Sequence, residues 1–170
     1  MKRTVLGLMV SMVVAAAIEV GQVPPKIVLD GEQGGRTDGT YWDSGSLKGK
    51  VHVLFYVDPD EKDLNEPLIN ALKKHHFDRK KYASVAVVNL AATWKPNVII
   101  EALLKKKQKE FPDTTYVKDK KSILVERWQL SDNNSDVLIF DKNGKLLYKK
   151  YGKLSPAEID KVLTLIEAHL

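Results

Sequence analysis

Acidic residues crowd the segment that directly follows the most apolar stretch of the chain. Asp58, Asp60, Glu61 and Asp63 fall within six positions of one another. Carboxylate oxygens are the ligands that Ca²⁺ and Mg²⁺ prefer, so this segment could hold a divalent cation and support metal-assisted chemistry. Aspartate is equally favoured in turns and at helix N-termini. We favour the turn interpretation and retain the cation site as the alternative.

The residue types of the chain exclude several other kinds of site. The sequence contains no cysteine, which excludes dithiol redox chemistry, thiol nucleophiles and thiolate metal sites. His75 and His76 are adjacent, whereas paired helical zinc ligands usually lie four residues apart. No G-x-S-x-G sequence marks a hydrolase nucleophile. We therefore expect no zinc site and no resident cofactor.

Basic residues outnumber acidic ones by 27 to 22, for a net charge of +5. The lysine-rich runs at residues 79–81 and 105–107 could face an anionic partner, but most such runs are solvated surfaces. A nucleic-acid-binding regulator is therefore only a minor alternative. Trp94 and Trp128 are expected in the core; an exposed tryptophan would instead mark a surface for a protein partner.

The first 17 residues have the pattern of a secretory signal peptide. Lys2 and Arg3 precede an apolar run over residues 5–14, and alanines at 15–17 provide the small residues of a cleavage site. The run is shorter than the roughly 20 residues that a membrane span needs. We expect cleavage near Ala17, one mature domain over residues 18–170, and no membrane span after cleavage.

Strand and helix signals alternate through the middle of the chain. Residues 51–57 are mostly apolar and rich in valine, which is typical of a central strand buried on both faces. A helix is predicted over residues 64–76 with Asp63 as its N-cap, and a second strand over residues 83–90. A second helix is predicted to begin at Pro96 and end near Glu110. Its apolar residues are Val98, Ile99, Leu103 and Leu104.

The last third of the chain contains strand signals at residues 115–117 and 137–140, with an ambiguous segment at 123–128 between them. Asn143-Gly144 predicts a type I′ hairpin that returns through residues 146–151. Ser155, Pro156 and Glu158 then form a complete helix start with a capping box.

Glycines mark the segment before the first long strand. Residues 27–29 form a short apolar stretch that is followed by Gly34, Gly35 and Gly39. This pattern predicts an edge strand and a hairpin, with the glycines in turns.

The order of these elements and several short motifs resemble a known family. The βαβα order followed by a hairpin and a helix looks like the thioredoxin-like arrangement. The motifs are Trp42, residues 47–51 (Leu-Lys-Gly-Lys-Val), residues 128–130 (Trp-Gln-Leu), and Asp141-Lys142 with Gly144. Taken in this order they resemble the YtfJ family of small exported bacterial proteins.

This resemblance implies an α/β fold with a thioredoxin-like central sheet flanked by helices and an N-terminal hairpin extension. It also implies a location in the bacterial periplasm and carries no assigned reaction. Where redox relatives have C-x-x-C after the first core strand, this chain has the acidic turn at residues 58–63. Where they have a cis-proline before the hairpin strand, spacing back from Asp141 places Ser135.

Asp58, Asp60, Glu61 and Ser135 are therefore the candidate ligand-binding residues, on two loops that the fold brings together. The function expected is a non-redox binding or interaction protein, whose partner is a protein or a small polar ligand. A metal-assisted enzyme that uses the acidic turn is the alternative.

Overall fold

The computed structural model describes residues 17–170 and contains a six-stranded mixed sheet with the order β2-β6-β5-β4-β7-β8. β4 is parallel to β5, β5 is parallel to β6, and the remaining neighbours are antiparallel. The strands of this sheet are β2 (Gly34–Arg36), β4 (Val51–Val57), β5 (Tyr82–Asn89), β6 (Thr114–Asp119), β7 (Ser135–Phe140) and β8 (Leu146–Lys150). The predicted signal peptide falls on residues 1–16, which lie outside the described part, and on Ala17.

β4 is the central strand that the sequence predicts. Its residues from Val51 to Tyr56 are all buried, and β5 and β7 pair with its two edges. Side chains alternate across a strand, so Leu54 and Tyr56 join one apolar cluster while Val53 and Phe55 join the other. The strand thus ties together the cores on both faces of the sheet.

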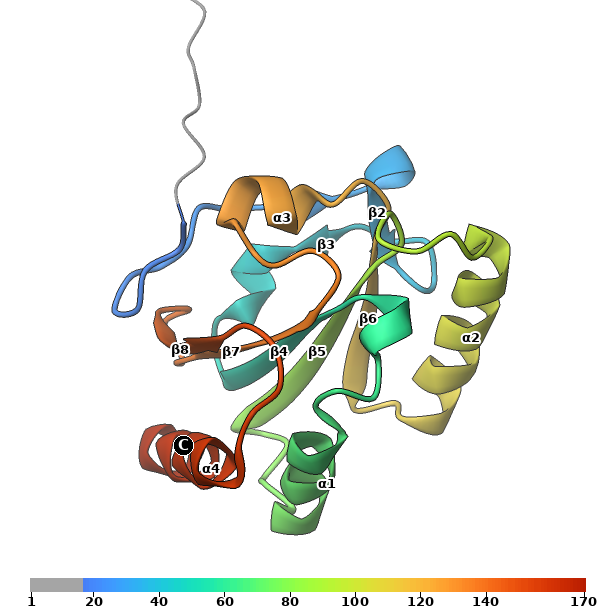
Figure 1. Cartoon of the computed structure of the whole chain (residues 1–170). Helices are drawn as coiled ribbons and strands as arrows, with labels where there is room; N and C mark the ends of the chain where they lie inside the picture. The colour runs from blue at the N-terminus through green and yellow to red at the C-terminus, as the bar shows by residue number, and fades with distance from the viewer. Residues whose placement is uncertain (1–16) are drawn as a thin grey trace, which may run out of the picture.

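Helices cover both faces of the sheet (Figure 1). α1 (Glu66–His75) and α4 (Pro156–His169) lie together on one face, while α3 (Ile123–Trp128) and the N-terminal segment cover the other. α2 (Asn97–Glu110) packs beside β6. Short 3₁₀ turns occur at η1 (Gly31–Gln33), η2 (Ser44–Leu47) and η3 (Pro59–Glu61). No helix of residues 17–170 is long and apolar enough to cross a bilayer.

Two local predictions about helix ends have different outcomes. The capping box of α4 is confirmed, because the Ser155 hydroxyl accepts the Glu158 N–H and the Glu158 carboxylate accepts the Ser155 N–H. The predicted cap at Asp63 is wrong: α1 begins two residues later than expected, at Glu66, and Asp63 pairs with the Lys62 ammonium. Asn65 occupies the N-cap position, but its side chain makes tertiary contacts instead of capping the helix.

The β7–β8 hairpin is confirmed, but its predicted turn type is wrong. A type I′ turn needs positive φ at both central residues, and of Asn143 and Gly144 only the glycine has it, at 77°. The Asp141 carboxylate instead accepts the backbone N–H groups of Asn143 and Lys145, each at 2.8 Å. The hydrogen bonds from the backbone to the Asp141 carboxylate therefore favour this turn type. The Asn-Gly pair alone does not predict it.

The N-terminal segment forms two kinds of pairing. β1 (Val28–Leu29) and β3 (Trp42–Asp43) make a separate two-stranded sheet, whereas β2 joins the edge of the main sheet beside β6. Gly34 and Gly35 therefore lie in a strand, so the prediction that places them in turns is wrong. A Cβ on Gly34, whose φ is 138°, would lie 1.9 Å from the Lys118 carbonyl oxygen. The close approach of the two backbones requires glycine there.

We predict that Gly34→Ala destabilises the fold much more than Gly39→Ala does. Gly39 also has positive φ, 91°, but open space surrounds its Cβ position. Alanine at 39 should cost about 1–2 kcal/mol of backbone strain, whereas alanine at 34 must also displace β6 and should cost roughly 3 kcal/mol or more. Urea unfolding of the two variants measures the difference. Equal losses would show that the β2–β6 pairing relaxes without cost.

Candidate functional site

The two loops predicted to carry the site do meet at one edge of the sheet. Asp58 directly follows β4, and Ser135 begins β7 opposite Val57. The Asp58 N–H donates to the Asn134 carbonyl at 2.8 Å, so the backbones of the two loops are joined. The structure thus brings Asp58 and Ser135 together, as the resemblance implies.

Both of these side chains are buried and bonded within the fold. The Asp58 carboxylate accepts the Asp60 N–H at 2.8 Å and caps η3. The Asn65 amide donates to the Ser135 carbonyl at 2.9 Å and to the Ser135 hydroxyl at 3.3 Å. Asn65 also accepts the Leu154 N–H at 3.0 Å, which links the start of α1 to the segment before α4. This part of the site has a structural role.

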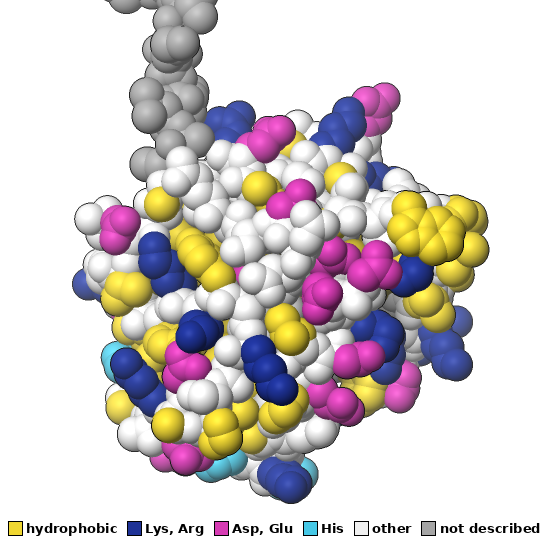
Figure 2. Space-filling view, in the orientation of Figure 1, with side chains coloured by type: hydrophobic (Ala, Val, Ile, Leu, Met, Phe, Trp, Pro, Cys, Tyr) yellow, Lys and Arg dark blue, Asp and Glu magenta, His cyan; other side chains and the backbone are white. Residues whose placement is uncertain are grey.

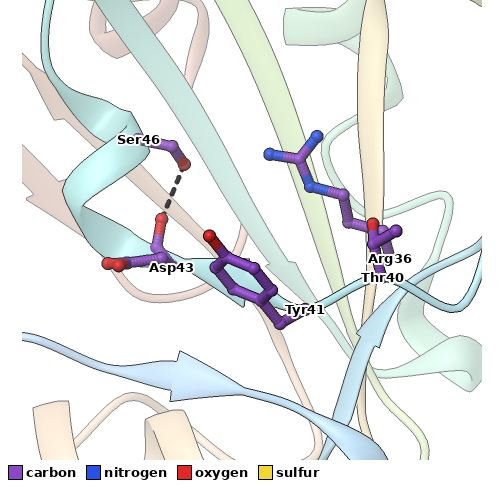
Figure 3. Close-up of a pocket in the computed structure, with 5 residues that line it drawn as sticks. All are labelled: Arg36, Thr40, Tyr41, Asp43 and Ser46. Atoms are coloured by element: carbon purple, nitrogen blue, oxygen red, sulfur yellow. Dashed lines mark hydrogen bonds between the residues drawn. The ribbon is translucent and has the colours of Figure 1, made fainter.

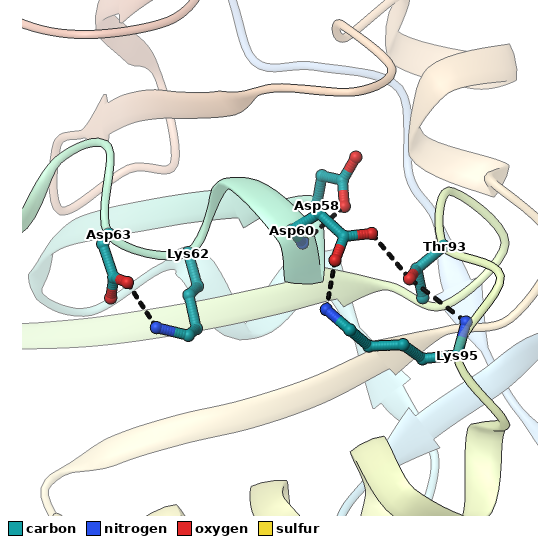
Figure 4. Close-up of polar contacts among 6 residues, drawn as sticks. All are labelled: Asp58, Asp60, Lys62, Asp63, Thr93 and Lys95. Carbon is teal, nitrogen blue, oxygen red and sulfur yellow. Dashed lines mark hydrogen bonds and ion pairs between the residues drawn. The ribbon is translucent and has the colours of Figure 1, made fainter.

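Asp58, Asp60 and Asp63 of the turn take separate partners (Figure 4). The Asp60 carboxylate pairs with the Lys95 ammonium and accepts the Thr93 hydroxyl at 2.7 Å. These contacts, that with Lys95 first, lower the pKa of Asp60. Glu61 is exposed, and residues 17–170 contain no group of three His, Asp or Glu side chains arranged to hold a metal. The geometry favours the turn interpretation.

A buried polar network that the sequence analysis did not identify lies beside this edge. Asp119, at the end of β6, is fully buried; its carboxylate accepts the Tyr56 hydroxyl at 3.1 Å and the N–H groups of Ile123 and Leu124. Burial, and then the Asp119 charge, raise the pKa of Tyr56. Asp119 therefore caps α3 from inside the core. The sequence signal that could have identified Asp119 is its position, as a polar residue, at the end of a strand.

Asp136 is the least satisfied member of this region. It is fully buried beside Tyr56 of β4, and its Oδ2 atom accepts the Ser131 N–H at 2.7 Å. Its Oδ1 atom has no hydrogen-bond partner among the described residues. Burial raises the pKa of Asp136 to about 6, against the opposing effect of the Ser131 N–H. The folded protein therefore keeps this carboxyl protonated to a higher pH than an ordinary aspartate, up to about pH 6.

We predict that Asp136 destabilises the fold as pH rises from about 4 to about 6. Its folded-state pKa exceeds the ordinary value of 3.8, so its most favourable contribution is present below pH 4 and is lost through pH 6. The loss should be on the order of 3 kcal/mol. Asp136→Asn should abolish this part of the pH dependence in urea unfolding. Asp160→Asn, at an exposed position of α4, is the control, and identical pH profiles for both variants would contradict the assignment.

The two tryptophans have opposite environments. Trp128 is buried as expected, and its indole N–H donates to the Pro25 carbonyl at 2.8 Å. The expectation that Trp94 lies in the core is wrong, because 86% of its surface is exposed. Thr93 and Lys95, on either side of it, are both held by Asp60. The acidic turn therefore fixes the segment that presents Trp94 to solvent.

α2 extends this exposed apolar surface. Ile100 and Leu104 are buried against β5 and Tyr116, but Val98, Ile99 and Leu103 are each more than half exposed. We call Trp94, Val98, Ile99 and Leu103 the Trp94 surface. Figure 2 shows apolar side chains gathered over the N-terminal end of α2, with basic side chains over its other end. Val98, Ile99, Ala102, Leu103 and Lys106 line a shallow hollow of about 510 Å³.

Comparisons with known proteins agree with the resemblance seen in the sequence. A family described as "Bacterial protein of unknown function (YtfJ_HI0045)" matches residues 19–169. An uncharacterized protein of Haemophilus influenzae is 31% identical over 74% of this chain and 70% of its own length. The uncharacterized protein YtfJ of Escherichia coli is 29% identical over 90% of this chain and 88% of its own.

Solved structures show the fold. A putative thiol:disulfide interchange protein DsbE of Chlorobium tepidum has a TM-score of 0.62 at 20% identity and covers 90% of this chain and 99% of its own. A putative thioredoxin of Neisseria meningitidis has a TM-score of 0.60 at 14% identity and covers 87% of this chain and 91% of its own. The thioredoxin-like fold is confirmed.

Proposed function

The chain belongs to the YtfJ family, and from this premise we propose that it is a non-redox, thioredoxin-like binding protein of the bacterial periplasm. Its partner is a protein that docks on the Trp94 surface. The thioredoxin-like fold supplies the scaffold, and a chain without cysteine has no thiolate with which to exchange disulfides.

The exposure of Trp94 carries the proposal. Scattered exposed apolar residues are ordinary, but here a tryptophan at 86% exposure comes shortly before a helix on which Val98, Ile99 and Leu103 are also exposed. Tryptophan is enriched among the few residues that supply most of the energy of protein interfaces. Asp60 bonds the side chains of the two residues that flank Trp94, the Thr93 hydroxyl and the Lys95 ammonium, so the indole is presented from a braced loop. Such a braced loop loses less conformational freedom on binding than a mobile one does.

The charges around the surface indicate the chemistry of the partner. Lys105, Lys106 and Lys109 are exposed on the C-terminal half of α2, and Lys106 lines the hollow itself. Within the helix, only Lys107 pairs with Glu110, at 3.7 Å. Charge complementarity therefore favours a protein segment whose apolar side chains are followed by carboxylates.

Trp94→Asp should weaken partner binding without unfolding the protein. Because the indole is exposed, its effect on stability should stay within about 0.5 kcal/mol, while the loss of a central interface residue should weaken binding roughly thirtyfold. The measurement is photo-crosslinking in cells from a photoreactive residue at Val98, with and without Trp94→Asp. The partner segment found in an adduct can then be purified and titrated against the protein with and without Trp94→Asp.

Tyr151 supplies the matched control position, because it is also an exposed large apolar residue but lies outside the Trp94 surface. A photoreactive residue there should not capture the same partner. Adducts that form equally from both positions would contradict the proposal, as would adducts that contain only lipid or only a second copy of the chain.

The location has its own test. The signal-peptide pattern predicts a mature protein in the periplasmic fraction that begins near Ile18. N-terminal sequencing of that fraction measures the start. Recovery of only a membrane-bound species that retains Met1 would refute export by a cleaved signal.

A further inference from the structure

A second hollow, of about 430 Å³, lies between the end of β2 and the β3–η2 segment and is independent of the Trp94 surface (Figure 3). Arg36, Thr40, Tyr41, Asp43 and Ser46 line it. We propose that this hollow binds a small organic anion through the Arg36 guanidinium. The ligand's binding group is an oxyanion, either a carboxylate or a phosphate ester.

Backbone hydrogen bonds fix the position of Arg36 relative to Tyr41 on the opposite side of the hollow. Arg36 ends β2 opposite Val117 of β6, so the main sheet anchors its backbone. Its N–H donates to the Thr40 carbonyl at 2.8 Å, and its carbonyl accepts the Gly39 N–H at 3.1 Å. This tight turn leads directly into Tyr41, and β3 begins at the next residue. The cation and the tyrosine therefore belong to one short, hydrogen-bonded loop.

Within residues 17–170, no carboxylate lies within ion-pair distance of the Arg36 guanidinium, although the charge of Asp38 acts on it from a greater distance. None of the ion pairs of this part of the chain includes Arg36, and its Nε atom is enclosed without a hydrogen-bond partner. Arginine stays charged at all relevant pH values, and an enclosed charged donor without an acceptor is unfavourable. Figure 3 shows the terminal nitrogens of Arg36 directed into the hollow. An oxyanion there would form charge-assisted hydrogen bonds with them.

The nearby carboxylates already have other partners. Asp43 Oδ2 lies 2.8 Å from the Lys26 ammonium, and Asp43 Oδ1 accepts the Gly45 N–H at 2.7 Å. Figure 3 shows this carboxylate turned away from Arg36. Asp38, on the turn, accepts both the N–H and the hydroxyl of Thr40. Arg36 and Asp38 attract each other without forming an ion pair, so the guanidinium nitrogens remain available to a ligand.

The opposite wall defines the rest of the ligand. The Tyr41 and Ser46 hydroxyls lie across the hollow from the guanidinium (Figure 3). Ser46 donates to the Asp43 carbonyl at 2.6 Å, which leaves its oxygen free to accept. Tyr41 is 59% exposed, and its ring offers a flat apolar wall. The volume lies within the range of small-molecule sites, so the hollow suits an anion attached to a ring or a short carbon chain.

Titration of the purified protein with four probes tests this site. The probes are phenyl phosphate, benzoate, inorganic phosphate and, as the uncharged control, benzyl alcohol. Phenyl phosphate or benzoate should shift the NMR signals of Arg36 Nε–H and Tyr41, while benzyl alcohol should not. The stronger of the two anions identifies the oxyanion as phosphate or carboxylate.

Arg36→Gln should weaken anion binding at least tenfold, because it removes the charge-assisted bonds. Arg127→Gln is the matched control, since Arg127 is an exposed arginine in α3 far along the chain from this hollow, and should bind as the wild type does. If Arg36→Gln does not fold, Tyr41→Glu at the exposed wall provides a second variant that should repel the anion. Binding that survives both substitutions overturns the proposal, as does an absence of shifts at Arg36 with millimolar anions.

Discussion

The burial of β4 on both faces and along both edges is the constraint on which the rest of the structure depends. Because β5 and β7 pair with it, the strand has no free edge, and its alternating side chains enter the cores on both faces of the sheet. The carboxyl end of β4 leads into the loop of Asp58, which lies next to the start of β7. The position of the candidate edge follows from this packing before any chemistry is considered.

At the edge formed by the end of β4 and the start of β7, the polar side chains that could bind a ligand are already hydrogen-bonded within the protein. Asn65 bridges Ser135 and Leu154, Asp58 caps η3, and Asp119 caps α3 while it accepts the Tyr56 hydroxyl. Buried polar groups are stable only when they are paired, and here nearly all of them are. A putative thiol:disulfide interchange protein of Chlorobium tepidum shares the fold, but in this chain the hydrogen bonds at this edge stabilise the scaffold. The surfaces that we propose to bind a partner and a ligand lie elsewhere, on α2 and beside β2.

The sequence predicts those parts of the fold that depend on local patterns. Residues 51–57 carry an apolar run that only a central strand explains, and Ser155 with Glu158 forms a cap that needs no distant partner. The failures have non-local causes. Asp63 does not cap α1, because its carboxylate pairs with Lys62 and Asn65 takes the N-cap position while its side chain bonds distant residues. Gly34 lies in a strand because β2 pairs with β6, and the close Lys118 carbonyl requires glycine at that position. Of the candidate site, the meeting of Asp58 and Ser135 was predictable; the ion pair of Asp60 with Lys95, 35 residues away, was not.

The contacts of Asp60 indicate a structural role for the acidic turn instead of a cation site. As a cation ligand, Asp60 would need a carboxylate that is free to point inward with its neighbours; the structure instead commits both of its oxygens to the loop that carries Trp94. An exposed ion pair usually contributes little to global stability, so the conformation of that loop is the main property that it can influence. The acidic turn thus links the rigid end of β4 to the Trp94 surface. In the interface that we propose, the Asp60 carboxylate contributes to recognition by positioning the Trp94 indole, and it need not bind any ligand to do so.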